Sequence, residues 1–168
     1  MKFLSKELLK MVKWGGERME GDFYKKILIA TDGSESGRQA ISAGMEIARL
    51  SRGKAYALYV IDNTDLLQGK EGQKWKMLME EQFKTLGLEL TATVEEAAKA
   101  AGIEVEFITL EGNPAEKILN FAEKQDIDMI VVGSLGKTAT ERFLLGSVSE
   151  RVVRNAKVPV LVVHGSRR

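Results

Sequence analysis

Five short apolar segments alternate with segments of helical periodicity, and this alternation constrains the fold of the 168-residue chain more than any other feature. The apolar segments are rich in Val and Ile, which is typical of strands buried on both faces of a sheet. Strands that alternate with helices predict a parallel sheet covered by helices on both faces, and right-handed crossovers make such a sheet open and doubly wound. The sequence therefore predicts a single Rossmann-like α/β domain over residues 23–165. Strands are expected at residues 26–31, 54–61, 103–110, 127–132 and 158–163.

Three helix starts are predicted from capping residues. Ser36 with Gln39, and Ser147 with Glu150, have the spacing of a capping box, in which each side chain satisfies a backbone N–H of the other residue. Residues 113–116 predict another start, with asparagine as the cap and proline at the first helical position. The helices at Ser36 and Asn113 start within five residues of a predicted strand, whereas the one at Ser147 starts 15 residues after the fourth.

The connection after the second strand is expected to contain one long helix over residues 73–101. Its apolar residues recur every three or four positions, and Gly87 is a predicted weak point within it. The preceding segment, residues 63–72, is polar and contains two glycines, so we expect a mobile loop there.

The segment with the most chemical content is residues 131–150, VVGSLGKTATERFLLGSVSE. Gly133 and Gly136 follow a strand, and Gly146 directly precedes Ser147 at a predicted helix start. Glycine lets backbone N–H groups approach a phosphate, and a helix N-terminus favours an anion. The alternative is that these glycines only satisfy turn geometry. The pattern favours a phosphate site in which Ser147 acts both as helix cap and as ligand.

Two basic residues, Lys137 and Arg142, lie inside this segment and would add positive charge near a phosphate chain. The segment is not a P-loop, because that motif requires glycine where this chain has Val131. The dinucleotide fingerprint Gly-x-Gly-x-x-Gly is also absent after the first strand.

Asp32 follows the first strand, where it can form a turn, bind a nucleotide or hold a metal on its phosphates. Ligands of doubly wound sheets bind beyond the carboxyl ends of the strands, where the strand order reverses. The turn at Asp32 and the turn from Gly133 to Gly136 are the candidates for that crevice. A phospho-receiver is disfavoured, because Asp32 and Asp62 follow different strands and form no acidic pair.

The composition excludes several classes of function. Lys and Arg number 25 and Asp and Glu 24, so the charge indicates no nucleic-acid partner. The chain has no cysteine and one histidine, His164, which excludes multi-histidine metal centres and disfavours a Ser-His-Asp enzyme. A cytoplasmic protein is expected.

Residues 1–22 form a predicted amphipathic extension. Its apolar residues, among them Leu4, Leu8 and Met11, alternate with four lysines at nearly helical spacing, and two glycines would end the helix. We expect it to pack on its own domain or on a sister subunit. Contact of residues 1–14 with a membrane surface is the alternative.

Residues 24–164 resemble the universal stress protein family. KKILIATDGSESGRQAI is similar to the opening strand and turn of the family, YVID to the end of its second strand, and DMIVVGSLG to its fourth strand. The spacing Gly-x2-Gly-x9-Gly-Ser, from Gly133 to Ser147, is similar to the signature of the ATP-binding class of the family. Leu135 departs from that class, which often has histidine or arginine there, and residues 1–22 lie outside the family pattern.

The resemblance implies a five-stranded sheet in the order 3-2-1-4-5, a homodimer through residues 158–163, and ATP with Mg or Mn on its phosphates. It also assigns a role to nine residues. The adenosine would contact Thr31, Asp32 and the backbone of Ala55, the ribose Val132 and Gly133, and the phosphates Gly136, Gly146, Ser147 and Val148. Lys137 is added to these candidates because of its charge and its position in the segment.

The function that these observations favour is an ATP-binding universal stress protein, a nucleotide-dependent regulatory switch with at most slow ATP hydrolysis and an unidentified protein partner. The alternative is a dimeric interaction scaffold that binds no nucleotide. An adenylate-processing enzyme is a third hypothesis, but the sequence shows no catalytic motif for it.

Overall fold

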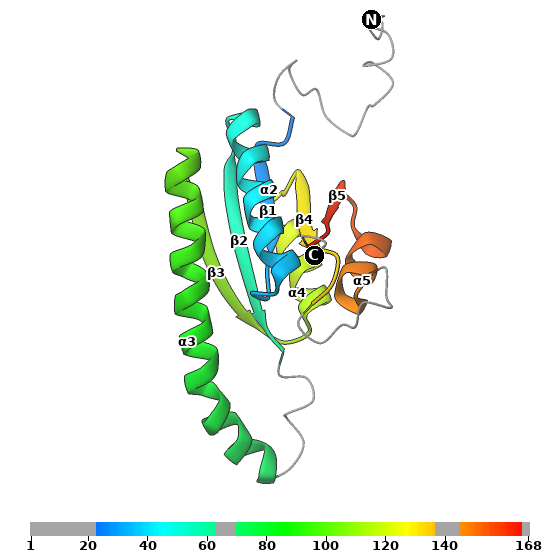
Figure 1. Ribbon diagram of the computed structural model, residues 1–168. Coiled ribbons are helices and arrows are strands. Elements are labelled where there is room, and N and C mark those ends of the chain that lie inside the picture. The colour runs from blue at the N-terminus through cyan, green and yellow to red at the C-terminus, as the bar shows by residue number, and fades with distance from the viewer. Residues whose placement is uncertain (1–22, 63–69, 137–144, 166–168) are drawn as a thin grey trace, which may run out of the picture.

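Five parallel strands form one sheet in the order β3-β2-β1-β4-β5, as expected (Figure 1). The computed structural model describes residues 23–62, 70–136 and 145–165. The strands are β1 (Lys26–Ala30), β2 (Lys54–Ile61), β3 (Val105–Glu111), β4 (Met129–Gly133) and β5 (Val160–Val163). The helices are α2 (Glu35–Ser51), α3 (Lys70–Ala101), α4 (Pro114–Lys124) and α5 (Ser147–Asn155).

The helices cover both faces of the sheet, and alternate residues of the central strands define the two halves of the core. Ile27, Ile29 and Val131 are buried together with α2 and α3. Leu28 and Val132 face the other way and are buried with α4 and α5. The chain proceeds outward from β1 through β2 to β3 and then returns to β4 on the other side of β1. The order therefore reverses between β1 and β4, where doubly wound sheets bind ligands.

Helix α3 is much longer than the sheet that it covers. Its 32 residues span about 48 Å at 1.5 Å per residue, whereas the eight residues of β2 span about 26 Å. The helix therefore extends past the carboxyl edge of the sheet (Figure 1). It continues through Gly87 and begins at Lys70, so the prediction of a loop at 70–72 was wrong. The rest of that predicted loop, residues 63–69, lies outside the described residues.

Two of the three predicted helix caps were wrong. Helix α2 is capped by Ser34, whose Oγ accepts from the N–H of Gly37 at 3.1 Å. Ser36 lies inside the first turn, because its hydroxyl bonds the backbone of Leu135. The cap of α5 is Gly146 and not Ser147, so this helix end has no side-chain cap within the part of the chain that the structure describes. The cap of α4 is confirmed: Asn113 Oδ1 accepts from the N–H of Glu116 at 3.2 Å.

The last strand, β5, lies at the edge of the sheet and directly follows Pro159, a residue type that is confined to edge strands or strand starts because it has no N–H to donate. It begins at Val160, two residues later than predicted. Pro159 still contributes to the sheet, because its carbonyl accepts from the N–H of Ile130 at 3.0 Å. In the described parts of the chain, no helix combines the length and the apolar character needed to cross a bilayer.

Candidate functional site

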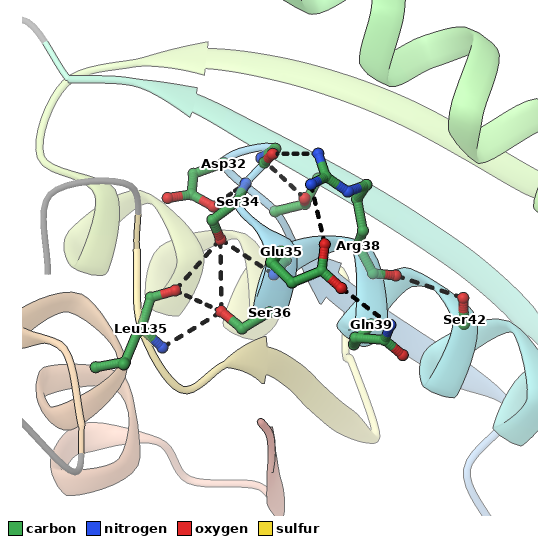
Figure 2. Close-up of polar contacts among 11 residues, drawn as sticks. Asp32, Ser34, Glu35, Ser36, Arg38, Gln39, Ser42 and Leu135 are labelled. Atoms are coloured by element: carbon green, nitrogen blue, oxygen red, sulfur yellow. Dashed lines mark hydrogen bonds and ion pairs between the residues drawn. The ribbon is translucent and has the colours of Figure 1, made fainter. Parts of the chain in front are cut away.

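The turns that follow β1 and β4 meet at the first turn of α2 (Figure 2). The backbone of Leu135 is the meeting point. Its carbonyl accepts from Ser34 Oγ at 3.2 Å and from Ser36 Oγ, and its N–H donates to Ser36 Oγ at 3.3 Å. The two serines thus join chain segments about one hundred residues apart, which holds the two turns together at the point where the strand order reverses and a ligand crevice is expected.

Gly133 is required by the packing of this junction. A Cβ at Gly133 would lie 2.5 Å from Ser36 Oγ, 2.8 Å from the backbone carbon of Ser36 and 2.9 Å from the nitrogen of Gly37. Backbone atoms of a helix cannot move aside without shifting the whole turn. Packing alone therefore explains why residue 133 is a glycine.

Gly136 and Gly146 lie together, and among the described residues no backbone atom would come closer than 3.4 Å to a Cβ at either position. The N–H of Gly146 donates to the carbonyl of Ser134 at 2.7 Å. A Cβ on Gly146 would meet its nearest atom at 3.4 Å and the nitrogen of Gly136 at 3.6 Å, which are ordinary contacts. Its φ of −74° is accessible to any residue. Among the described residues, a Cβ on Gly136 would meet the end of the Asp32 side chain, Oδ2, at 3.0 Å, and this flexible side chain would have to shift slightly.

The N-terminus of α5 opens beside these two glycines. No side chain of the described residues caps it, and Ser147, the first helical residue, is exposed. The Ser149 hydroxyl donates to the carbonyl of Gly133 at 2.6 Å and so fixes the helix end against β4. The first-turn N–H groups and the helix dipole make such an end a site for anions. Ser149 was missed, because its position within a predicted capping box did not indicate a contact back to the strand.

Asp32 lies on the β1 side of the crevice. Its Oδ1 accepts from the N–H of Ser34 at 3.0 Å, and its Oδ2 is the atom that faces Gly136. The neighbouring Thr31 is buried, and its Oγ1 accepts from the N–H of Gly33 at 3.3 Å.

Tyr59 of β2 is electrostatically coupled to Asp32. Burial raises the pKa of the Tyr59 phenol above its ordinary value, and the negative charge of Asp32 raises that pKa further. Tyr59 was not predicted, because its position within an apolar strand indicated only a core residue.

The register of the sheet excludes Ala55 from this crevice, so the expectation for its position was wrong. Ala55 pairs with Ile27 near the start of β1, whereas the N–H of Thr31 donates to the carbonyl of Leu58 at 3.0 Å. The part of β2 beyond Leu58, which includes Tyr59, is therefore the part beside the crevice.

The remaining predicted site residues are two valines near the turns and two basic residues. Val132 is at the end of β4, but its side chain is buried under α4 and α5, and only its backbone is near the turn. Val148 is half-buried against the same part of the core. Lys137 and Arg142 lie outside the described residues.

The side-chain oxygens near this site suit a metal ion that is bound partly by the phosphates of a ligand. Among the described residues, no group of three or more Asp, Glu or His side chains could hold a metal ion by itself. Mg²⁺ is commonly bound through one or two carboxylates together with substrate phosphates. The carboxylate of Asp32, facing Gly136, matches this requirement.

The universal stress protein family profile matches residues 23–164. The chain belongs to this family. A universal stress protein of Methanocaldococcus jannaschii, MJ0531, is 42% identical over 142 residues, which cover 84% of this chain and 83% of the relative. The solved structure of a second protein of that organism, MJ0577, matches with a TM-score of 0.75 and 30% identity, covering 87% of this chain and 99% of the other.

A universal stress protein solved in complex with cAMP matches with a TM-score of 0.63 and 27% identity. The match covers 86% of this chain and 99% of the other. The cAMP-bound neighbour is thus a relative with a nucleotide ligand. The strand order that the family resemblance implies agrees with the sheet described above.

Proposed function

We propose that the protein binds ATP in the crevice between the turns after β1 and β4, and that it acts as a nucleotide-dependent regulatory switch. The observation that carries this proposal is the pair Gly136 and Gly146. They lie together beside the N-terminus of α5, which no side chain of the described residues caps, and no described backbone atom would come closer than 3.4 Å to a Cβ at either position.

In the proposed complex, the phosphates contact the backbone of Gly136 and Gly146 and the first turn of α5, with Ser147 and Val148. Ser147 is free for this role, because it is not the helix cap. We propose that Lys137, outside the described residues, also contacts the phosphates, and that Mg or Mn is held by the phosphates and Asp32.

The adenosine would then lie on the β1 side of the crevice. Thr31 and Asp32 are at the end of β1, and the backbone of Val132 and Gly133 would lie along the ribose. The last residues of β2, past Leu58, take the role for which Ala55 was expected, because they are the part of β2 next to Thr31.

The relative with bound cAMP supports a nucleotide ligand. We favour ATP because two anion-binding elements, the turn at Gly136 and the start of α5, suit a chain of several phosphates better than a single one. Hydrolysis should be slow, because Asp32 already accepts from the N–H of Ser34 and would be engaged by the metal, which leaves it poorly suited to act as a base.

The alternative is a dimeric scaffold without nucleotide. The observation in its favour is β5, an edge strand of four half-buried apolar residues on which a second subunit could pair. We propose this strand as the dimer contact in either case, so dimerisation alone does not distinguish the two functions.

Chemical unfolding with and without Mg-ATP tests the proposal. A ligand at 100 times its Kd adds about 2.7 kcal/mol to the free energy of unfolding. We expect this gain for the natural protein and its loss for Gly136→Val, whose side chain would project toward Asp32. An equal response of both proteins, or no response of either, would favour the scaffold.

A further inference from the structure

A pocket lies at the amino edge of the sheet, at the end opposite to the candidate nucleotide site. Its volume is about 400 Å³, and it is formed by the end of α4, the turn into β4 and the connection from α5 to β5. Its apolar lining residues are Leu119, Ala122, Ile127, Ile130, Ala156 and Val158. Exposed charged residues, Glu123, Asp126 and Lys157, surround this floor. We call it the α4–α5 groove.

The groove favours positively charged groups at its rim. Both α4 and α5 end beside it, and the carbonyl groups at helix C-termini attract cations. One such contact is present: Lys26 Nζ donates to the carbonyl of Gln125, the C-cap residue of α4, at 2.8 Å. On the other side, Lys157 pairs with Glu123 of α4 at 2.8 Å.

The start of the domain is fixed beside this groove. Asp128 Oδ2 accepts from the N–H groups of Lys25 and Lys26 at 2.8 and 2.9 Å, and the N–H of Asp128 donates to the carbonyl of Lys26 at 2.9 Å. The turn that makes these bonds also contributes Asp126 and Ile127 to the groove lining. Residues 1–22 are therefore tethered at the groove.

We propose that residues 1–14 of the same chain dock in the α4–α5 groove, with their apolar side chains on its floor and their lysines at the two helix C-termini. Four lysines and one glutamate, Glu7, give this segment, apart from its terminus, a charge of 4 − 1 = +3. The eight residues from 15 to 22 can extend over about 26–29 Å. Helix α4, with 11 residues, is about 16 Å long, so the tether reaches every part of the groove.

Disulfide trapping in the full-length chain tests the docking, because the natural sequence contains no cysteine. Leu119→Cys supplies one thiol in the groove, and Leu4→Cys, Leu8→Cys or Met11→Cys, one at a time, supplies the other. The matched control pairs each of these with Leu88→Cys, an exposed position on α3, on the opposite face of the sheet. We expect at least one groove pair to form an intramolecular disulfide ten or more times faster than its control, because docking raises the local thiol concentration.

Filling the groove provides the second measurement. Ala156→Phe should slow the fastest groove pair at least five-fold and leave the control pair unchanged, and thermal unfolding of each variant verifies that it folds. Groove pairs that all react at the control rate would overturn the proposal. Disulfide-linked dimers in place of linked monomers would also overturn it, since the groove would then hold the segment of a second copy.

Discussion

Gly133 and Gly146 belong to the same motif, but their surroundings predict opposite effects of substitution. Gly133→Ala places a Cβ 2.5 Å from Ser36 Oγ and 2.8 Å from a backbone carbon of α2. Gly146→Ser places a Cβ no closer than 3.4 Å to its nearest neighbour, and serine is a preferred N-cap residue. The first change should damage the fold, and the second should affect only ligand binding.

The expected magnitudes follow from these contacts. Overpacking of a tight junction costs about 1–3 kcal/mol, which lowers the Tm of a domain of this size by about 2–12 °C. Serine in place of glycine at an N-cap adds a few tenths of a kcal/mol to the free energy of unfolding, roughly a 1 °C rise at most. The new serine oxygen would occupy the first-turn N–H groups of α5, so the affinity for ATP should fall at least about ten-fold, or about 1.4 kcal/mol.

Thermal unfolding followed by circular dichroism, with ATP titrations of both variants, measures these effects. The reasoning predicts an unstable Gly133→Ala protein and a stable Gly146→Ser protein that binds ATP weakly. It would be refuted by a Gly133→Ala protein as stable as the natural one, or by a Gly146→Ser protein that binds ATP with unchanged affinity.

Four further predictions concern the polar groups of the fold. Asp32→Asn should lower the pKa of Tyr59 toward its ordinary value, although burial will still keep that pKa raised. Tyrosinate absorbance measures the pKa, and its comparison with Tyr59→Phe identifies the transition of Tyr59. An unchanged pKa would contradict the effect of Asp32 on Tyr59. Since the raised pKa of Tyr59 favours the protonated phenol in the folded state, its contribution to stability is complete below pH of about 10 and is lost as pH rises through the higher folded-state pKa; denaturant unfolding of the natural protein and Tyr59→Phe across this range measures the difference. Ser149→Ala removes the hydroxyl that donates to the carbonyl of Gly133 and should lower the free energy of unfolding by about 1–3 kcal/mol. Ser147→Ala, at an exposed position, should change it by no more than about 0.5 kcal/mol. Equal effects of the two variants would contradict the role given to Ser149. Asp128→Ala leaves the backbone N–H groups of Lys25 and Lys26 without this acceptor and should cost about 1–3 kcal/mol in urea unfolding, with a smaller loss for Asp128→Asn. An alanine variant as stable as the natural protein would contradict this expectation.

The order of elements was predictable from the sequence because period and burial agree along most of the chain. Ile27, Leu28 and Ile29 are fully buried on alternating faces, and this produces the continuous apolar run that identified a central parallel strand. The cap at Asn113 was also predictable, because its partner, Glu116, lies only three residues away.

The errors arose where a side chain binds a residue far away in the sequence. Ser36 has the spacing of a local cap, but its hydroxyl bonds Leu135, 99 residues later, and Ser34 takes the capping role. Ser149 binds Gly133 in the same way, across 16 residues. A capping rule considers only local partners, so it cannot recognise a serine engaged by another turn.

The position of the candidate site was predictable, but the role of each residue was not. The pattern identified Gly133, Gly136 and Gly146 as one group. Only the contacts separate Gly133, where a Cβ would overlap helix backbone, from two glycines that show no such overlap among the described residues. Ala55 failed because a position counted from the start of β2 ignores the register, which brings the other end of that strand to Thr31.

The most direct test of the central claim is a calorimetric titration of Mg-ATP into the full-length protein after removal of any nucleotide that remains bound through purification. The account predicts saturable binding of one ATP per chain, weakened at least about ten-fold, or about 1.4 kcal/mol, in Gly146→Ser. The absence of saturable binding to the folded, nucleotide-free protein would contradict it.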